Sequence, residues 1–160
     1  NSTEIHFTHV GMVPELRAYA DCLKGWSKCV NVSLPAIIVK TSVSMDEIVA
    51  RYKVLAGEER WFDIQDDLFA SNVKSIDPSH SPYFGFAEGK AAVRKKGEDF
   101  VARIEAFHGA STTDVVIGGN YFAVGRNVDI TVKGFGRIQI NQVMLYEVKD
   151  GQIVTEQFFY

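Results

Sequence analysis

Residues 141–160 of the chain read NQVMLYEVKDGQIVTEQFFY. Two strand-like runs meet there at Asp150-Gly151, a pair that favours a tight type I′ hairpin because both positions tolerate a positive φ. The second run ends on the aromatic residues Phe158, Phe159 and Tyr160, which indicate that it closes a hydrophobic core. The segment therefore predicts an antiparallel hairpin inside a larger sheet.

Outward from this hairpin, glycine-containing turns divide the preceding sequence into further strands, and the sequence before these strands has helical periodicity. The expected strands of an antiparallel meander are 112–118, 121–133, 136–149 and 152–160. The expected helices are 44–57, 61–69 and about 90–107, with an early strand at 73–77. Ser44 and Glu47 form a capping box at the start of the first of these helices. The order of elements predicts an α+β fold.

The first 42 residues have a pattern of their own. Residues 3–10 alternate like a strand, and apolar residues then recur at helical spacing from Pro14 to about Pro35. One strand and one long helix cannot close a core alone. We therefore expect residues 1–42 to form an N-terminal extension and residues 43–160 to form the main domain.

Composition excludes several classes of function. A net charge of −3 and the lack of any dense Lys/Arg cluster argue against nucleic-acid binding. No membrane-spanning apolar run and no signal-peptide pattern are seen, so we expect a cytoplasmic protein without a membrane partner. Cys22 and Cys29 would lie about 10 Å apart along a helix, too far for a disulfide, and have no neighbouring metal ligands. We expect reduced thiols, no metal and no cofactor.

Three segments of the main domain resemble the SnoaL-like proteins of the nuclear-transport-factor-2-like superfamily. They are residues 68–78 (LFASNVKSIDP), 89–94 (GKAAVR) and 144–154 (MLYEVKDGQIV). The resemblance implies a cone-like, curved antiparallel sheet packed on three helices, with a pocket between the layers. Residues 3–15 (TEIHFTHVGMVPE), with Trp26 and Ser33-Leu34, resemble the last strand and C-terminal helix of the START-like (SRPBCC) fold of chaperone ATPase activators.

The SnoaL-like resemblance implies that any chemistry is done by polar residues on the pocket side of the late strands. Glu156 shares a face with Val154 and Phe158 by strand alternation, so it would be an acid among apolar neighbours. Burial would raise its pKa and suit it to general acid–base catalysis. The alternative is a carboxylate at the rim that is either paired with Lys149 or solvated.

Two further candidates for catalysis are His108 and Asp77. His108 can act as an acid or base, or it can be a C-terminal residue of the third helix that is stabilised by the helix dipole. Asp77 can line the pocket mouth or simply end its strand. The candidate ligand-binding residues lie on apolar helix stripes or on the late strands: Tyr52, Trp61, Gln142, Met144 and Phe158. The helix aromatics among them, Tyr52 and Trp61, are more commonly core residues at such positions, and the alternative is a place in the pocket wall.

Two functions follow from this reading. The first is binding of an apolar small molecule in the pocket, by a cofactor-free isomerase, cyclase or dehydratase that works by proton transfer. The second is a non-catalytic ligand-binding or dimerisation module, and a homodimer is expected in either case. The amides of Asn141 and Gln142 stand where relatives often carry acids, and an amide orients a ligand but transfers no proton at pH 7. Whether the protein is an enzyme stays open at this point.

Overall fold

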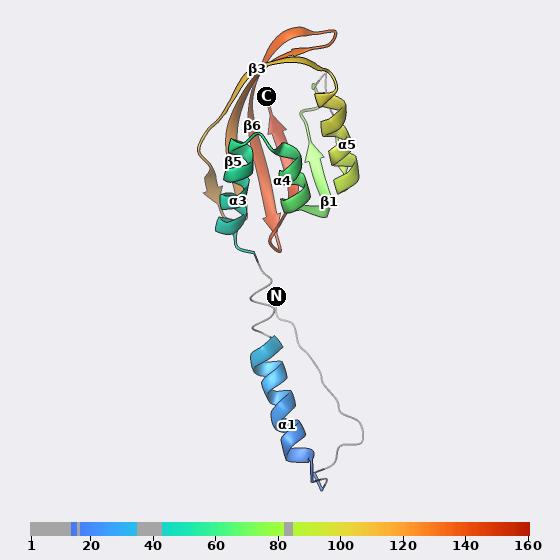
Figure 1. The fold of residues 1–160 in the computed structure, drawn as a ribbon, viewed down its shortest axis with the longest axis vertical. Coiled ribbons are helices and arrows are strands. Elements are labelled where there is room, and N and C mark those ends of the chain that lie inside the picture. The colour runs from blue at the N-terminus through green and yellow to red at the C-terminus, as the bar shows by residue number, and fades with distance from the viewer. Residues whose placement is uncertain (1–13, 16, 35–42, 82–84) are drawn as a thin grey trace. The chain divides into compact units, whose positions relative to one another are not determined.

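The computed structural model describes residues 14–15, 17–34, 43–81 and 85–160 of the chain, which divides into two units, 1–42 and 43–160 (Figure 1). In the first unit, the helical periodicity gives α1 (Tyr19–Lys28), which continues as the π-helical η1 (Cys29–Ser33). Both cysteines are unpaired thiols, and Cys29 is exposed. The strand predicted at residues 3–10 lies outside the described residues.

Three helices and a seven-stranded sheet make up the second unit. The helices are α3 (Met45–Gly57), α4 (Trp61–Leu68) and α5 (Lys90–Val101). The predicted capping box begins α3, where Ser44 Oγ accepts from the Glu47 amide at 3.2 Å and the Glu47 carboxylate accepts from the Ser44 amide at 2.8 Å. These two bonds satisfy backbone donors that a helix start otherwise leaves unpaired.

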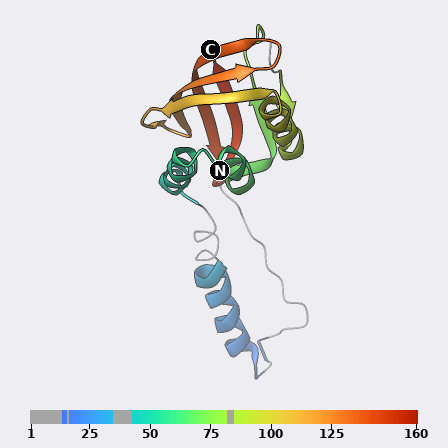
Figure 2. The same cartoon turned by 45° about the horizontal axis from the view of Figure 1, so that its top comes forward.

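The sheet has the order β2-β1-β7-β6-β5-β3, with β4 paired to β5. Figure 2 shows the sheet and the helices of this unit from a second direction. The strands are β1 (Phe69–Ile76), β2 (Ala87–Glu88), β3 (Ile104–Thr112), β4 (Val116–Gly118), β5 (Tyr121–Val132), β6 (Gly136–Lys149) and β7 (Gln152–Phe159). The α+β class and the meander of the late strands are confirmed. The sheet is mixed rather than wholly antiparallel, because β1 runs parallel to β7.

The hairpin at Asp150-Gly151 is formed as predicted. Both residues have positive φ, 51° and 73°, as a type I′ turn requires. A bulge follows in β7, since Glu147 pairs with Thr155 and Val148 pairs with Ile153, which leaves Val154 without a partner. Ile153, rather than the predicted Val154, is therefore buried on the same face as Glu156.

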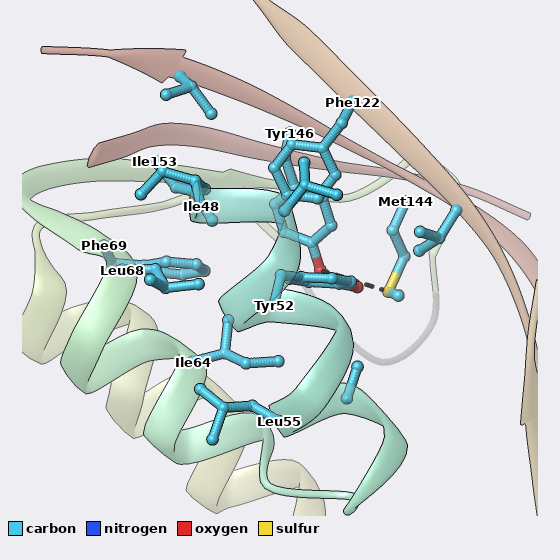
Figure 3. Close-up of a cluster of buried hydrophobic side chains, with 14 of the residues drawn as sticks. Ile48, Tyr52, Leu55, Ile64, Leu68, Phe69, Phe122, Met144, Tyr146 and Ile153 are labelled. Atoms are coloured by element: carbon cyan, nitrogen blue, oxygen red, sulfur yellow. Dashed lines mark hydrogen bonds between the residues drawn. The ribbon is translucent and has the colours of Figure 1, made fainter. Parts of the chain in front are cut away.

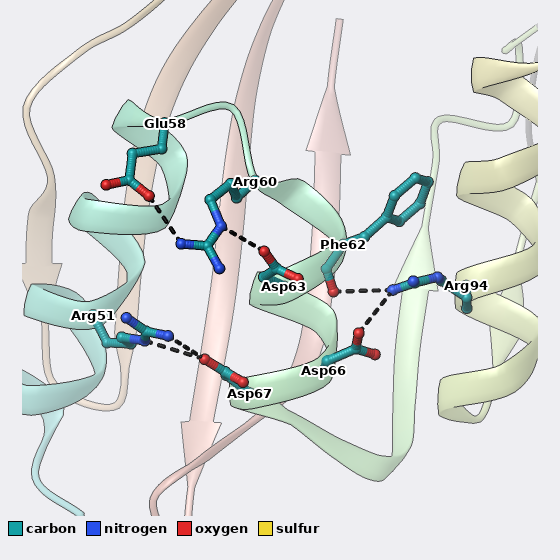
Figure 4. A network of polar contacts seen from close by, with 8 residues as sticks. All are labelled: Arg51, Glu58, Arg60, Phe62, Asp63, Asp66, Asp67 and Arg94. Atoms are coloured by element: carbon teal, nitrogen blue, oxygen red, sulfur yellow. Dashed lines mark hydrogen bonds and ion pairs between the residues drawn. The ribbon is translucent and has the colours of Figure 1, made fainter.

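One hydrophobic core joins α3 and α4 to one face of the sheet, which we call the inner face (Figure 3). The largest fully buried members include Tyr52, Leu55, Ile64, Phe122, Tyr146 and Ile153. Polar contacts on the outside hold the helices together (Figure 4). Arg51 of α3 pairs with Asp67 of α4 at 2.6 Å, and Arg94 of α5 donates to the Phe62 carbonyl at 3.0 Å.

The third helix and the strand after it differ from the prediction. The helix expected over about 90–107 ends at Val101, and β3 begins at Ile104 within the range that periodicity assigned to the helix. Ile104 and Phe107 fit a helical spacing locally, but antiparallel pairing of β3 with β5 provides long-range backbone hydrogen bonds. That pairing decides the conformation here. No described helix is both long and apolar enough to cross a membrane.

Candidate functional site

A cavity of about 430 Å³ lies between the inner face of the sheet and helices α4 and α5. Its wall is mainly apolar, and the size suits a small organic ligand. The charged residues that line it come from two strands, one helix and two positions outside them, and they form two separate groups. One group surrounds Glu156 of β7, and the other surrounds Arg126 of β5.

Glu156 is placed by strand register. Ser75, Glu156, Tyr146 and Phe122 are direct cross-strand neighbours on β1, β7, β6 and β5. Glu156 is only 7 % exposed, and Ser75 Oγ donates a hydrogen bond to its Oε1 at 2.6 Å. No hydrogen bond to Oε2 is found within the described residues. One carboxyl oxygen is therefore held by the protein, and the other is available to a ligand.

A buried ion pair stands behind this carboxyl. Lys96 of α5 donates to Ser75 Oγ at 2.8 Å and also to Asp77, the residue that follows β1. The side chains of Lys96 and Asp77 are 15 % and 2 % exposed. The Tyr160 hydroxyl donates to the second Asp77 oxygen at 3.0 Å. Glu156, Ser75, Lys96, Asp77 and Tyr160 thus form one hydrogen-bonded chain along the cavity wall.

This environment changes the acidity of Glu156. Burial raises the pKa of the Glu156 carboxyl to about 7, although the Ser75 hydrogen bond and the Lys96 ammonium partly oppose that rise. Asp77 adds to it through like-charge repulsion. A carboxyl with a pKa near 7 exchanges a proton readily at neutral pH, as a general acid or base must.

The second group is built around the guanidinium of Arg126. Arg126 is 8 % exposed and donates to both carboxylate oxygens of Glu59, at 3.1 and 2.6 Å. It also donates to Thr112 Oγ1 at 3.1 Å, and its guanidinium lies 4.1 Å from the centre of the Trp61 ring. Trp61 Nε1 donates to Glu59 at 2.8 Å. Burial alone would raise the pKa of Glu59, but the hydrogen bonds from Arg126 and Trp61 lower it.

Two buried tyrosines are joined by a hydrogen bond and stand next to Met144 (Figure 3). The Tyr52 hydroxyl donates to that of Tyr146 at 3.3 Å, and the Tyr146 hydroxyl donates to Met144 Sδ at 3.6 Å. Burial raises the pKa of Tyr52, and likewise that of Tyr146, so both remain neutral donors. Tyr146 lines the cavity beside Glu156, whereas Tyr52 lies in the core.

Six of the eight predicted site residues line the same cavity: Glu156, Asp77, Trp61, Gln142, Met144 and Phe158. Asp77 was expected either to line the pocket or to end its strand, and it does both, because it directly follows β1 and lines the cavity. The alternative of a Glu156–Lys149 rim pair is wrong, because Lys149 pairs with Glu147 at 2.7 Å and Glu156 is buried. Tyr52 is a core residue instead.

His108 is not brought to the cavity. It lies within β3 rather than at a helix end, so the dipole interpretation is wrong. Its ring is exposed, and Nε2 lies 2.8 Å from Thr131 Oγ1 of β5. Its neighbour Phe107 lines the cavity instead, because successive strand residues face opposite sides of a sheet.

Several residues of the site were missed at the level of sequence. Arg126 shares one face of β5 with Phe122, Val124 and Val128, because every second residue of a strand faces the same side. A charge on an apolar face is the same signal that singled out Glu156. Ser75 and Lys96 carry no such local signal. They belong to the site only because β1 and α5 approach β7 in space.

Comparisons with known proteins agree with this architecture. A candidate SnoaL-like polyketide cyclase from Mesorhizobium loti is similar at 28 % identity and a TM-score of 0.69, over 74 % of this chain and 100 % of that one. A protein with a ketosteroid isomerase-like fold from Catenulispora acidiphila, in complex with trimethylamine, is similar at 18 % identity and a TM-score of 0.55, over 73 % and 87 %. An NTF2-like protein from Burkholderia thailandensis reaches 13 % and 0.61, over 71 % and 87 %.

No curated protein matches the chain. The model of the SnoaL-like domain family matches residues 43–160, which is well over half of the chain. The matched region starts after the N-terminal extension, whose START-like resemblance remains a prediction. The chain belongs to the SnoaL-like domain family.

Proposed function

We propose that this protein binds a mostly apolar small molecule in the cavity and transfers a proton on it with Glu156, as a cofactor-free isomerase, cyclase or dehydratase. The observation that carries the proposal is the placement of one carboxyl, with a pKa of about 7 and a free Oε2, in an otherwise apolar wall. Other charged residues of the lining are held in ion pairs, which leaves Glu156 as the group fitted to exchange protons.

The chemistry would begin with removal of a proton from a carbon next to a carbonyl group. Glu156 Oε2 takes the proton while the bonding electrons move to the carbonyl oxygen, and the protonated carboxyl then returns the proton at another atom. Tyr146 lies across the strand pair from Glu156 and can donate to that oxygen, because its present acceptor, Met144 Sδ, is weak. The Tyr52 hydroxyl supports the Tyr146 oxygen as negative charge develops near it.

Glu156→Gln is expected to reduce proton exchange at least about a hundredfold, since the amide keeps the shape of the side chain but accepts no proton. A panel of cyclic ketones in D₂O, followed by NMR, measures exchange at the carbons beside the carbonyl without knowledge of the natural substrate. The matched control is Glu147→Gln, on the opposite face of β6, which should exchange like the unchanged protein. Equal exchange by the Glu156 variant would remove this residue from the mechanism.

A second proposal concerns assembly, because the outer face of the sheet carries exposed apolar side chains. Val116, Val143 and Phe159 are 71 %, 47 % and 47 % exposed. Val143 and Phe159 are direct cross-strand neighbours, so they form one continuous patch. A second copy of the chain would bury this patch, which supports a homodimer with or without catalysis.

Val143→Lys is expected to convert the homodimer to a monomer, because it places a charge in the middle of the patch. Light scattering coupled to size-exclusion chromatography measures the change as a mass of one chain instead of two. Val54→Lys is the matched control, since Val54 is similarly exposed but lies on α3. A monomeric unchanged protein, or a dimer that tolerates Val143→Lys, would rule out pairing through this face.

A further inference from the structure

The charges at the cavity suggest which kind of ligand it accepts. Lys96 is paired with Asp77, and Arg126 is paired with Glu59, so the lining offers no cation in excess of its carboxylates. Glu156 adds negative charge whenever it is ionised. An anionic ligand would be repelled by the Glu156 carboxylate, and each cation of the lining is already paired with a carboxylate of the protein.

Arg126 in particular is poorly placed to receive a ligand carboxylate. Glu59 already occupies both ends of its guanidinium fork, and Thr112 accepts a further bond. Glu59 reaches this position from a backbone with φ +58°, a conformation that costs a non-glycine residue about 1 kcal/mol or more. A strained residue held by three hydrogen bonds from the two side chains of Arg126 and Trp61 indicates a built-in counter-ion rather than an open anion site.

Two primary amides, in contrast, lack partners. Gln65 Oε1 is buried without a hydrogen-bond partner, and no hydrogen bond of the Gln142 side chain is found within the described part of the chain. Both residues line the cavity. A buried polar atom without a partner, such as Gln65 Oε1, costs about 1–3 kcal/mol, and a ligand that completes its hydrogen bond recovers that cost. Gln142 is half-buried, so its amide is accessible from the cavity.

Each amide is next to one member of the stack of Arg126 on Trp61. Gln142 is the cross-strand neighbour of Arg126, which places their Cβ atoms about 5 Å apart. Gln65 lies one helical turn after Trp61, at about 6 Å. Gln142 is four residues from Tyr146 on β6, about 13 Å along the strand from the row that contains Glu156.

We propose that Gln65 and Gln142 form a recognition subsite for a neutral group that both donates and accepts hydrogen bonds, such as a hydroxyl or a carboxamide, at the end of the ligand remote from Glu156. This inference rests on the proposed function and adds the substrate class: an uncharged, elongated apolar molecule with one such polar end. Amides suit this task because each presents a donor and an acceptor without a charge. The ion pair of Arg126 and Glu59 then stabilises the cavity wall, and the two amides make the hydrogen bonds to the ligand.

The test compares three probes that share one biphenyl scaffold: 4-phenylphenol, 4-methylbiphenyl and biphenyl-4-carboxylate. We expect 4-phenylphenol to bind about tenfold more tightly than the other two, as one net hydrogen bond provides. Gln142→Met should abolish this preference and leave 4-methylbiphenyl binding unchanged. The matched control is Gln157→Met, whose side chain lies outside the cavity lining. Affinities are measured by calorimetry. The side-chain NH₂ resonances of Gln65 and Gln142 should shift in NMR spectra when 4-phenylphenol is added.

The outcomes separate this inference from the proposed function. Tighter binding of the carboxylate, or a hydroxyl preference that survives Gln142→Met, would overturn the amide subsite and leave a ligand cavity intact. Failure of all three probes to bind would overturn both, because the cavity would then hold no apolar molecule.

Discussion

Lys96→Met is expected to lower the free energy of unfolding at pH 7 by about 3–5 kcal/mol, the usual cost of removing one partner of a buried ion pair. The remaining carboxylate of Asp77 is 2 % exposed and would keep only the Tyr160 hydroxyl among the partners described above. The same variant should raise the pKa of Glu156 above about 7, because the Lys96 ammonium now lowers it. Urea unfolding measures the first effect, and NMR titration of the carboxyl measures the second.

Two comparison variants separate charge from packing. Lys95→Met changes the adjacent residue, whose ion pair with Asp99 is exposed, and should leave stability unchanged. The double variant Lys96→Met/Asp77→Asn removes both charges and should recover most of the loss. A double variant as unstable as Lys96→Met would show that the lysine acts through packing, for example against the Phe158 ring.

The stability of the protein relative to Glu156→Gln is expected to fall by about 3 kcal/mol as the pH rises from 4.5 to 8. Below pH 4.5 Glu156 is protonated in both the folded and the unfolded chain. Between its ordinary pKa of 4.5 and its folded pKa of about 7, the unfolded chain releases the proton while the folded chain retains it. A raised pKa therefore stabilises the fold at low pH, and that contribution is lost as the pH rises.

Urea unfolding of both proteins at half-unit pH intervals measures this difference and cancels the titration of other groups. At pH 8 the Glu156→Gln variant should be the more stable protein, since it buries no ionised carboxyl at the cavity. Such a result would mean that the acid is retained at a cost in stability, as is common at active sites. A pH-independent difference would mean that the folded pKa of Glu156 is close to its ordinary value, and the proposed base would lose its basis.

Much of the fold was predictable because its signals are local. The Asp150-Gly151 turn, the Ser44 capping box and the alternation of β5, β6 and β7 depend on neighbouring residues alone. The prediction was wrong where a short segment satisfied two periodicities. Residues 104–107 continue a helical pattern, yet pairing with β5 makes them part of a strand. The parallel pairing of β1 with β7 also leaves no trace in either strand's sequence.

The candidate site divides in the same way. Alternation along single strands placed Glu156, Gln142 and Met144 on one side of the sheet, and the cavity contains all three. It could not separate Tyr52, which is buried in the core, from residues that line the cavity wall. His108 shows the opposite error, because a helix was expected where a strand turns its ring away from the cavity.

The sequence by itself determined the turn of the hairpin of residues 141–160 and the inward face of Glu156, since a period of two and a glycine turn act over a few residues. The bulge at Val154 was not determined in this way. Only the tertiary structure decided what surrounds that carboxyl. Ser75 lies 81 residues away in sequence, and the Arg126–Glu59 pair spans 67 residues. Burial, ion pairing and the resulting pKa depend on distances through space, which the packing of α4, α5 and β1 on the sheet establishes.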